Sequence, residues 1–329
     1  MDDIDRKLLI ILSANPRIHF HDLAKQLGLS RQAVHHRTQA LKDLGVIKGA
    51  IAGISVPYLD AVPIVVFGRS KTASFETTLD RLAESDLSRR ALVAGGNFLY
   101  VVGLLRNISE LDSYADFVRR TTEMQEPTVG IYNPDDGLIP DYTVDGGGWK
   151  RRSSYKELSP LDLKIIASLK DDARKPIAEI AEMVGVTSKT ARRHLESMIS
   201  EGSLEFTVPA DMLPGGDMLT LVHVNLREGA DKEKFGKRLL SKRWFRDQYV
   251  RTFSNLPGFL VWVFWSDKIM EIRRAFKEVA EDEDVVAIMP NFAYLERLYQ
   301  TWRDRLPEVR NPPSVKTRDQ KQRSGRWNR

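Results

Sequence analysis

The sequence contains no cysteine, and this absence excludes several classes of protein. Disulfide-stapled folds, thiolate zinc sites, iron–sulfur clusters and cysteine nucleophiles all require that residue. Long apolar runs are missing too, because no stretch approaches the roughly 20 apolar residues of a membrane-spanning helix. The opening residues, MDDIDRKLLIIL, lack the pattern of a signal peptide. We therefore expect a cytoplasmic protein without a membrane partner.

Most of the chain also lacks an excess of either charge. The 329 residues include 50 Lys and Arg and 45 Asp and Glu, a formal net charge of +5. Residues 303–329 alone hold nine of these cations and three of the anions, a net of +6. A basic segment with Pro, Ser and few apolar residues is typical of disorder and suits a polyanion, although it can also serve solubility alone. We predict a basic disordered tail over residues 307–329.

What the chain does contain is a duplication. Residues 2–47 align without a gap on residues 159–204, at an offset of 157 positions. Apolar positions agree throughout the two copies, so the repeat must organise the fold. The identical pairs include Asp5 and Asp162, Lys7 and Lys164, Leu12 and Leu169, Arg17 and Arg174, Ala24 and Ala181, Gly28 and Gly185, and Gly45 and Gly202.

Each copy predicts three helices. In the first copy, apolar residues from Ile4 to Leu12 recur at helical spacing, and Asn15-Pro16 ends that run. A short second helix closes at Gly28, a residue suited to a left-handed cap. Ser30 is then a good N-cap for a third helix, as Thr187 is in the second copy.

A short helix, a turn with Gly and a capped polar helix form the helix-turn-helix pattern, in which the start of the third helix enters the major groove of DNA. The third helices, at about 30–44 and 187–200, both begin with cationic side chains and end with apolar ones. A three-helix bundle that binds protein, or nothing, is the alternative. We predict DNA contacts from Ser30, Arg31, Gln32, His35, His36, Arg37, Thr187, Ser188, Lys189, Arg192, Arg193 and His194.

A second pattern follows each helical unit. Its order is strand, helix, strand, strand, helix, strand, which is ferredoxin-like. In the first half the predicted elements are 62–67, 75–82, 91–93, 98–102, 111–124 and 128–132. In the second half they are 219–226, 232–242, 249–253, 259–264, 269–279 and 285–289, and the spacing of apolar residues predicts an extra helix over 292–305.

At this point the chain resembles the Lrp/AsnC (feast/famine) family of bacterial and archaeal transcription regulators. The likeness covers nearly the whole chain, twice over. It is carried by Ile4-Asp5-Arg6-Lys7-Leu8-Leu9, Leu23-Ala24, Gly28-Leu29-Ser30, Val34, Arg37, Leu41, Leu44-Gly45-Val46-Ile47 and the hairpin at 96–101. The departure is the duplication, since family members usually have one copy and pair as dimers.

The resemblance implies an α+β protein with two winged or tri-helical helix-turn-helix units, each followed by a ferredoxin-like (RAM-type) domain. The two halves should then form an intramolecular pseudo-dimer that associates further. Double-stranded DNA is the expected partner, together with a small-molecule effector such as an amino acid. We expect neither a cofactor nor a metal ion. The expected divisions are 1–50, 58–133, a linker at 134–157, 158–207, 215–306 and the tail at 307–329.

The effector assignment depends on position alone. Gly95, Gly96 and Asn97 join two predicted strands near the place where the family would bind an amino acid. An ordinary hairpin turn explains the same residues equally simply.

Two other functions compete with regulation of transcription. Sirohaem decarboxylases look like the same double architecture and bind a tetrapyrrole, which would require histidine and arginine in the sheet domains. Five of the six histidines, however, lie in the helix-turn-helix units, and His223 alone lies in a sheet domain. A scaffold whose helices bind proteins is the third reading. The cationic side chains at the start of both third helices favour a regulator that is not an enzyme.

Overall fold

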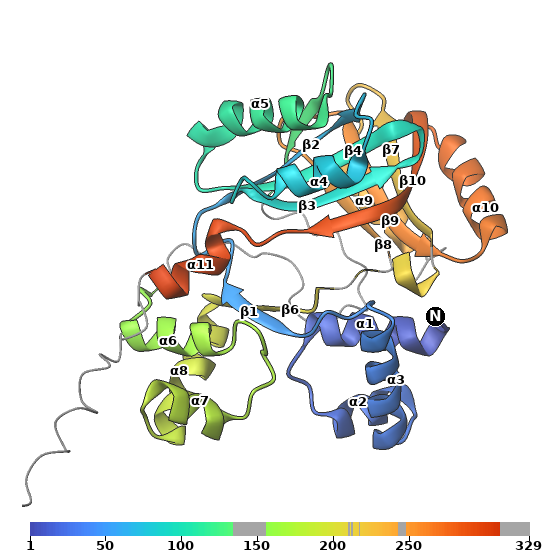
Figure 1. Cartoon of the computed structure of the whole chain (residues 1–329). Helices are drawn as coiled ribbons and strands as arrows, with labels where there is room; N and C mark the ends of the chain where they lie inside the picture. The colour runs from blue at the N-terminus through green and yellow to red at the C-terminus, as the bar shows by residue number, and fades with distance from the viewer. Residues whose placement is uncertain (134–155, 210, 212, 217, 243–247, 310–329) are drawn as a thin grey trace, which may run out of the picture.

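The computed structural model describes residues 1–133, 156–209, 211, 213–216, 218–242 and 248–309. The expected linker falls mostly outside these residues, and the tail lies outside them from residue 310 onward. Figure 1 shows two layers, with an upper layer of strands and covering helices and a lower layer of two helical units side by side. None of the described helices is long and apolar enough to cross a membrane.

The lower layer consists of the two predicted three-helix units. The first contains α1 (Asp3–Ala14), α2 (Phe20–Leu27) and α3 (Arg31–Asp43), and the second contains α6 (Pro160–Ser168), α7 (Ile177–Val184) and α8 (Ser188–Glu201). Gly28 and Gly185 adopt φ of 66° and 74° at the ends of α2 and α7, a conformation that favours glycine. The helix-turn-helix geometry expected from the sequence is therefore present in both copies.

A short ribbon that the sequence did not predict joins the two units. Strand β1 (Ile51–Ile54) pairs antiparallel with β6 (Leu204–Thr207). The ribbon also exchanges partners between the units: Ile54 of β1 is buried in the core of the second unit, whereas Val208, just after β6, is buried in the core of the first. Each helical unit is therefore completed by a segment that follows the other one in the chain.

The upper layer contains the two predicted ferredoxin-like halves. The first is built from β2 (Val62–Arg69), α4 (Phe75–Leu82), β3 (Ser88–Ala94), β4 (Phe98–Leu105), α5 (Leu111–Thr122) and β5 (Thr128–Ile131). The second is built from β7 (Met218–Leu226), α9 (Lys232–Ser241), β8 (Gln248–Thr252), β9 (Phe259–Ser266), α10 (Ile269–Ala280) and β10 (Val285–Leu298). Three short 3-10 turns complete the described elements: Gly95–Asn97, Ile108–Glu110 and Leu213–Gly215.

The two halves form one sheet rather than two. The strand order is β5-β2-β4-β3-β10-β7-β9-β8, with β3 paired to β10 at the centre. The outer strands also meet, because Tyr132 after β5 bridges to Phe253 after β8. Asn255 strengthens this junction: its amide donates to Val129 O (2.7 Å) and accepts from Ile131 N (2.9 Å). The sheet therefore curls round on itself within one chain.

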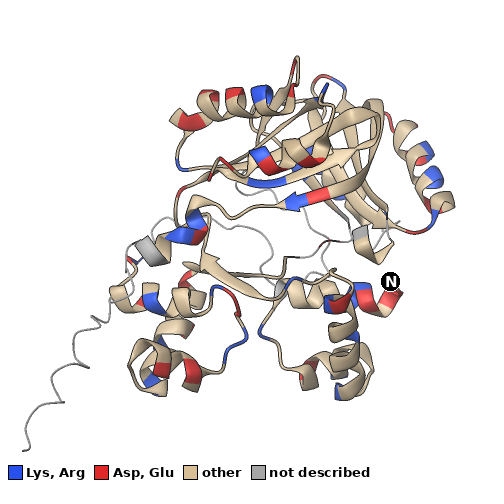
Figure 2. Ribbon diagram, in the orientation of Figure 1, with Lys and Arg blue, Asp and Glu red and all other residues tan. Residues whose placement is uncertain are grey.

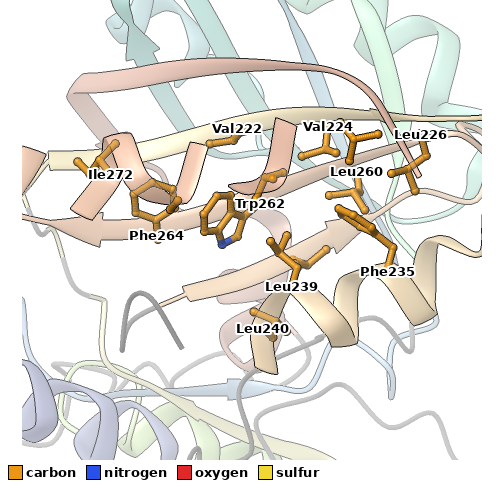
Figure 3. Packing of buried hydrophobic residues seen from close by; sticks show 14 residues of the cluster. Val222, Val224, Leu226, Phe235, Leu239, Leu240, Leu260, Trp262, Phe264 and Ile272 are labelled. Carbon is orange, nitrogen blue, oxygen red and sulfur yellow. The ribbon is translucent and has the colours of Figure 1, made fainter. Parts of the chain in front are cut away.

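The curled sheet has a different core on each face. Outward-facing residues pack under the helices, and Figure 3 shows this packing in the second half around the fully buried Trp262. The inner face is aromatic, with Phe67, Phe259 and His223 in mutual ring contact. The hydroxyl of Tyr100 and Nε2 of His223 are hydrogen-bonded at 2.6 Å, which links the two halves across the interior.

The helix predicted over 292–305 is wrong in its first part. Strand β10 continues to Leu298 against β3, and the helix α11 spans Trp302–Val309. The register shifts between Ala293 and Leu295, so Ala293 lies in the inner core whereas Leu295 packs under the helices of the first half. This bulge breaks the alternation of a strand and produces the apolar spacing that resembles a helix. Helix α11 extends past residue 306, so residues 307–309, which we assigned to the tail, are helical.

Candidate nucleic-acid interface

Helix α3 has one face in the core and one face open to solvent. Val34, Thr38 and Leu41 are buried, and the Thr38 hydroxyl donates to Val34 O (2.8 Å). The helix begins at Ser30, whose hydroxyl accepts from Ala33 N (3.1 Å) as predicted. On the open face lie the exposed side chains of Arg31, Gln32, His35 and His36.

Helix α8 repeats this arrangement. Ala191, Leu195 and Met198 are buried, and the Thr187 hydroxyl accepts from Thr190 N (3.2 Å) to cap the helix. The exposed residues at its start are Ser188, Lys189, Arg192 and Arg193. Both helices therefore present donors and positive charge where a reading helix would meet phosphates and base edges. Figure 2 shows both units on the same side of the molecule, below the sheet.

Two of the predicted contact residues have partners inside their own unit. Arg37 Nη1 lies 2.7 Å from both Asp2 and Asp5 at the start of α1. The hydrogen bonds that Arg37 donates to these two carboxylates raise its pKa above its usual range. The charge of Arg37 is thus already partly balanced, and its main role in this geometry is to hold α3 against α1.

His194 occupies the position equivalent to Arg37 in the second unit. Its Nδ1 lies 2.7 Å from Asp162, the counterpart of Asp5. Burial raises the pKa of Asp162, but hydrogen bonds from Ser159 and His194 outweigh that effect, so the pKa lies below its usual value. Sequence reasoning missed this pair in both units, although the repeated Asp at the start of each first helix was the available signal.

The turn assigned to an effector is exposed. Gly95, Gly96 and Asn97 form a short 3-10 turn between β3 and β4, in which Gly96 and Asn97 have φ of 68° and 59°. Positive φ favours these two residue types, so the turn itself accounts for their presence. Contact with an effector stays a prediction.

No metal centre accompanies these residues. Across the described parts of the chain, no group of three or more His, Asp or Glu side chains is arranged to hold a metal ion. His35 and His36 point in different directions on α3, and the ring of His35 instead meets that of Phe20 edge-on at 6.0 Å.

Comparison with known proteins agrees with this geometry. A model of winged helix-turn-helix DNA-binding domains matches residues 1–48 and again 158–204. Among curated proteins, the HTH-type transcriptional regulator Ptr1 of Methanocaldococcus jannaschii is 30% identical over 116 residues, which are 35% of this chain and 78% of Ptr1. The regulatory protein AsnC of Escherichia coli is 27% identical over 114 residues, 34% of this chain and 75% of AsnC.

Among solved structures, the siroheme decarboxylase NirDL matches nearly end to end. The alignment covers 93% of this chain and 98% of NirDL, with a TM-score of 0.59. At 13% identity this likeness concerns the fold alone. Each regulator above aligns over at least three quarters of its own length but over only about one third of this chain, as expected if the chain contains two copies. The chain therefore belongs to the Lrp/AsnC family of helix-turn-helix transcription regulators and carries the family's architecture twice.

Proposed function

We propose that the chain regulates transcription by binding duplex DNA with α3 and α8 together. The observation that carries this proposal is the shared layout of the two helices, in which buried apolar residues anchor the helix and exposed cations occupy its first turns. Phosphate contacts would supply affinity and side chains at base edges would supply specificity.

The geometry divides the predicted contact residues by task. Arg31, Gln32, His35 and His36 on α3, and Ser188, Lys189, Arg192 and Arg193 on α8, have exposed side chains and are the proposed DNA contacts. Ser30 and Thr187 hold the helix ends, and Arg37 and His194 hold the helices against their units. An effector at Gly95–Asn97 and further self-association belong to the same proposal.

Substitution of exposed cations tests this function. Arg31→Ala and Arg192→Ala should each weaken binding to a selected operator, by about 1–3 kcal/mol where the side chain reads a base edge. Arg274→Ala is a matched control, because Arg274 is an exposed arginine paired with Glu278 on the distant helix α10. Fluorescence anisotropy with labelled duplex would measure all three. Unchanged affinity in both α3 and α8 variants would contradict the proposal.

A tetrapyrrole enzyme is the second candidate, because NirDL shares the whole double architecture. Arginine side chains that could pair with the carboxylates of a tetrapyrrole do lie in the sheet. Arg90 on β3 is paired with Glu296 at 2.7 Å, and Arg251 on β8 lies over the ring of Tyr249 at 4.6 Å. Against this candidate, His223 is buried among phenylalanine rings and hydrogen-bonded to Tyr100. A tetrapyrrole absorbance band in the purified protein would favour the enzyme.

A further inference from the structure

A reciprocal pair of arginines connects the two helix-turn-helix units. Arg17 lies in the loop between α1 and α2, and Arg174 lies at the matching place between α6 and α7. Arg174 donates from Nη1 to Pro16 O (2.6 Å) and from Nη2 to Ile18 O (2.8 Å). These two carbonyls flank Arg17, so each arginine reaches into the loop that carries the other.

The exchange in the opposite direction uses the equivalent atoms. Arg17 donates from Nη1 to Ala173 O and from Nη2 to Lys175 O (3.2 Å), the carbonyls on either side of Arg174. Each guanidinium thus spans two carbonyls two residues apart, a task that suits its planar fork better than the compact ammonium of lysine. Figure 1 shows the two loops facing each other between the units.

Local structure prepares both side chains for this contact. The main-chain N–H of Arg17 donates to Oδ1 of Asn15 (3.2 Å), and that of Arg174 donates to Oδ1 of Asp172 (2.8 Å). Such turns fix the backbone from which the side chain leaves. Arg174 also lies over the ring of Phe20, 4.5 Å from its centre, which adds a cation–π contact across the junction.

The contact must overcome the cost of burying two positive charges beside each other. Both arginines are half-buried, and burial lowers the pKa of each; the charge of Arg174 lowers the pKa of Arg17 further. Four carbonyl oxygens that accept from the two guanidiniums, together with the nearby negative charge of Asp172, offset the repulsion between these like charges. A pairing with this cost depends on good geometry, so it favours one relative position of the two loops.

The β1–β6 ribbon also connects the units. It pairs four residues of each strand, from Ile51 with Thr207 to Ile54 with Leu204. A two-stranded ribbon can still twist. A second attachment at the α1–α2 and α6–α7 loops removes that freedom, because two separated contacts define an orientation that one cannot.

We propose that Arg17 and Arg174 are positioning residues that fix the separation and angle of α3 and α8, and thereby the spacing of the two DNA half-sites that the chain accepts. This inference rests on the proposed DNA-binding function for its consequence, but its geometric part can be tested without DNA.

The distance between the two reading helices provides that test. Because the chain has no cysteine, the double variant Gln39→Cys/Glu196→Cys places one spin label at the same exposed position of each helix. Pulsed electron paramagnetic resonance spectroscopy should give a narrow distribution of distances between the two labels when Arg17 and Arg174 are present. Adding Arg17→Ala and Arg174→Ala should broaden or shift it, and the lysine pair Arg17→Lys/Arg174→Lys should do so as well although it keeps both charges.

A matched control removes two arginines elsewhere. Arg81 and Arg274 are exposed on α4 and α10, so Arg81→Ala/Arg274→Ala should leave the distance distribution unchanged. Near-ultraviolet circular dichroism checks that each variant is folded, and the lysine pair serves if the alanine pair is not. A folded variant at Arg17 and Arg174 that kept the parent's distance distribution would overturn the inference.

Binding to a series of operators tests the functional consequence. The parent should prefer one half-site spacing over a spacing shifted by two base pairs by about tenfold, since a rigid pair gains effective concentration only at matching geometry. The alanine pair should reduce that preference to about threefold or less, with unchanged affinity for a single half-site. A uniform loss of affinity for every duplex would instead identify the two arginines as phosphate contacts. A parent that binds no DNA would refute the proposed function. The spin-label distances would still show whether Arg17 and Arg174 fix the positions of α3 and α8.

Discussion

At the scale of single residues, His223 shows how burial inside the sheet disfavours protonation of an imidazole. Its side chain is 4% exposed, and burial lowers its pKa from 6.5 to about 4. The residue is therefore neutral in the folded chain at any pH well above that value. Its role in the described structure is a hydrogen bond between the halves, through Tyr100, rather than proton transfer at an open site.

This shift predicts a pH dependence of stability. Between pH 6.5 and about 4 the unfolded chain binds a proton at His223 that the folded chain does not, so the free energy of unfolding should fall as the pH falls. The slope is about 1.4 kcal/mol per pH unit, giving at most about 3 kcal/mol over the window. Urea unfolding of the parent and of His223→Phe, compared at each pH, isolates this contribution from that of other groups. A constant difference between the two proteins across the window would refute the shift.

Residue identity also explains what could be predicted at this scale. Ser30, Thr187, Gly28 and Gly185 follow from local rules, because a cap or a left-handed turn depends on only a few neighbouring residues. The pairing of Arg37 with Asp5, 32 positions away, depends on how α3 crosses α1. The sequence spacing that placed Arg37 among the predicted DNA contacts therefore could not reveal this pairing.

At the scale of elements, the segments that sequence reasoning missed are those stabilised by distant partners. Strands β1 and β6 have four residues each and pair across about 150 positions of the chain. The last part of β10 finds its partner in β3, just over 200 positions earlier. Local periodicity cannot reveal such pairing, whereas it did locate the three helices of each unit and the elements of both ferredoxin-like halves.

The exchanged ribbon leads to a prediction about local stability. Ile54→Ala should destabilise the second helical unit, α6 to α8, although residue 54 directly follows the first unit in the chain. The side chain is fully buried there, and such truncations cost about 2–5 kcal/mol. Hydrogen exchange should show faster opening of α6 to α8 with little change in α1 to α3.

Val208→Ala supplies the matched control for that experiment. Val208 follows the second unit in the chain but is buried in the core of the first, so its truncation should accelerate exchange in α1 to α3 instead. If each substitution affected the unit that precedes it in sequence, the exchange of partners described here would be wrong.

At the scale of the whole molecule, charge is concentrated at one end of the chain. The net +6 of residues 303–329 lies entirely beyond Val309, in residues outside the described structure. From the sequence we expect these residues to add affinity for any DNA without reading its bases. The rest of the chain is close to neutral, so its attraction to DNA depends on how the cations of α3 and α8 are placed.

Deleting residues 311–329 tests this expectation. Each phosphate neutralised by the tail adds about 0.9 to the slope of log affinity against log salt, so the loss of even three contacts should be measurable. The truncated protein should bind every duplex more weakly, with a flatter salt dependence and an unchanged preference for its site. Titrations at several salt concentrations, with specific and scrambled duplexes, would measure both effects. Loss of the specific site alone would mean that the tail reads sequence.

The junction of β3 with β10 has a further consequence, since it joins two halves that belong to one chain. A pair of identical subunits separates on dilution, and every substitution in it appears twice. Here the partner is always present, so the two helix-turn-helix units should stay joined however scarce the protein becomes. Each half can also change without its counterpart, as Arg37 and His194 already illustrate, and the operator that such a molecule reads need not be a palindrome.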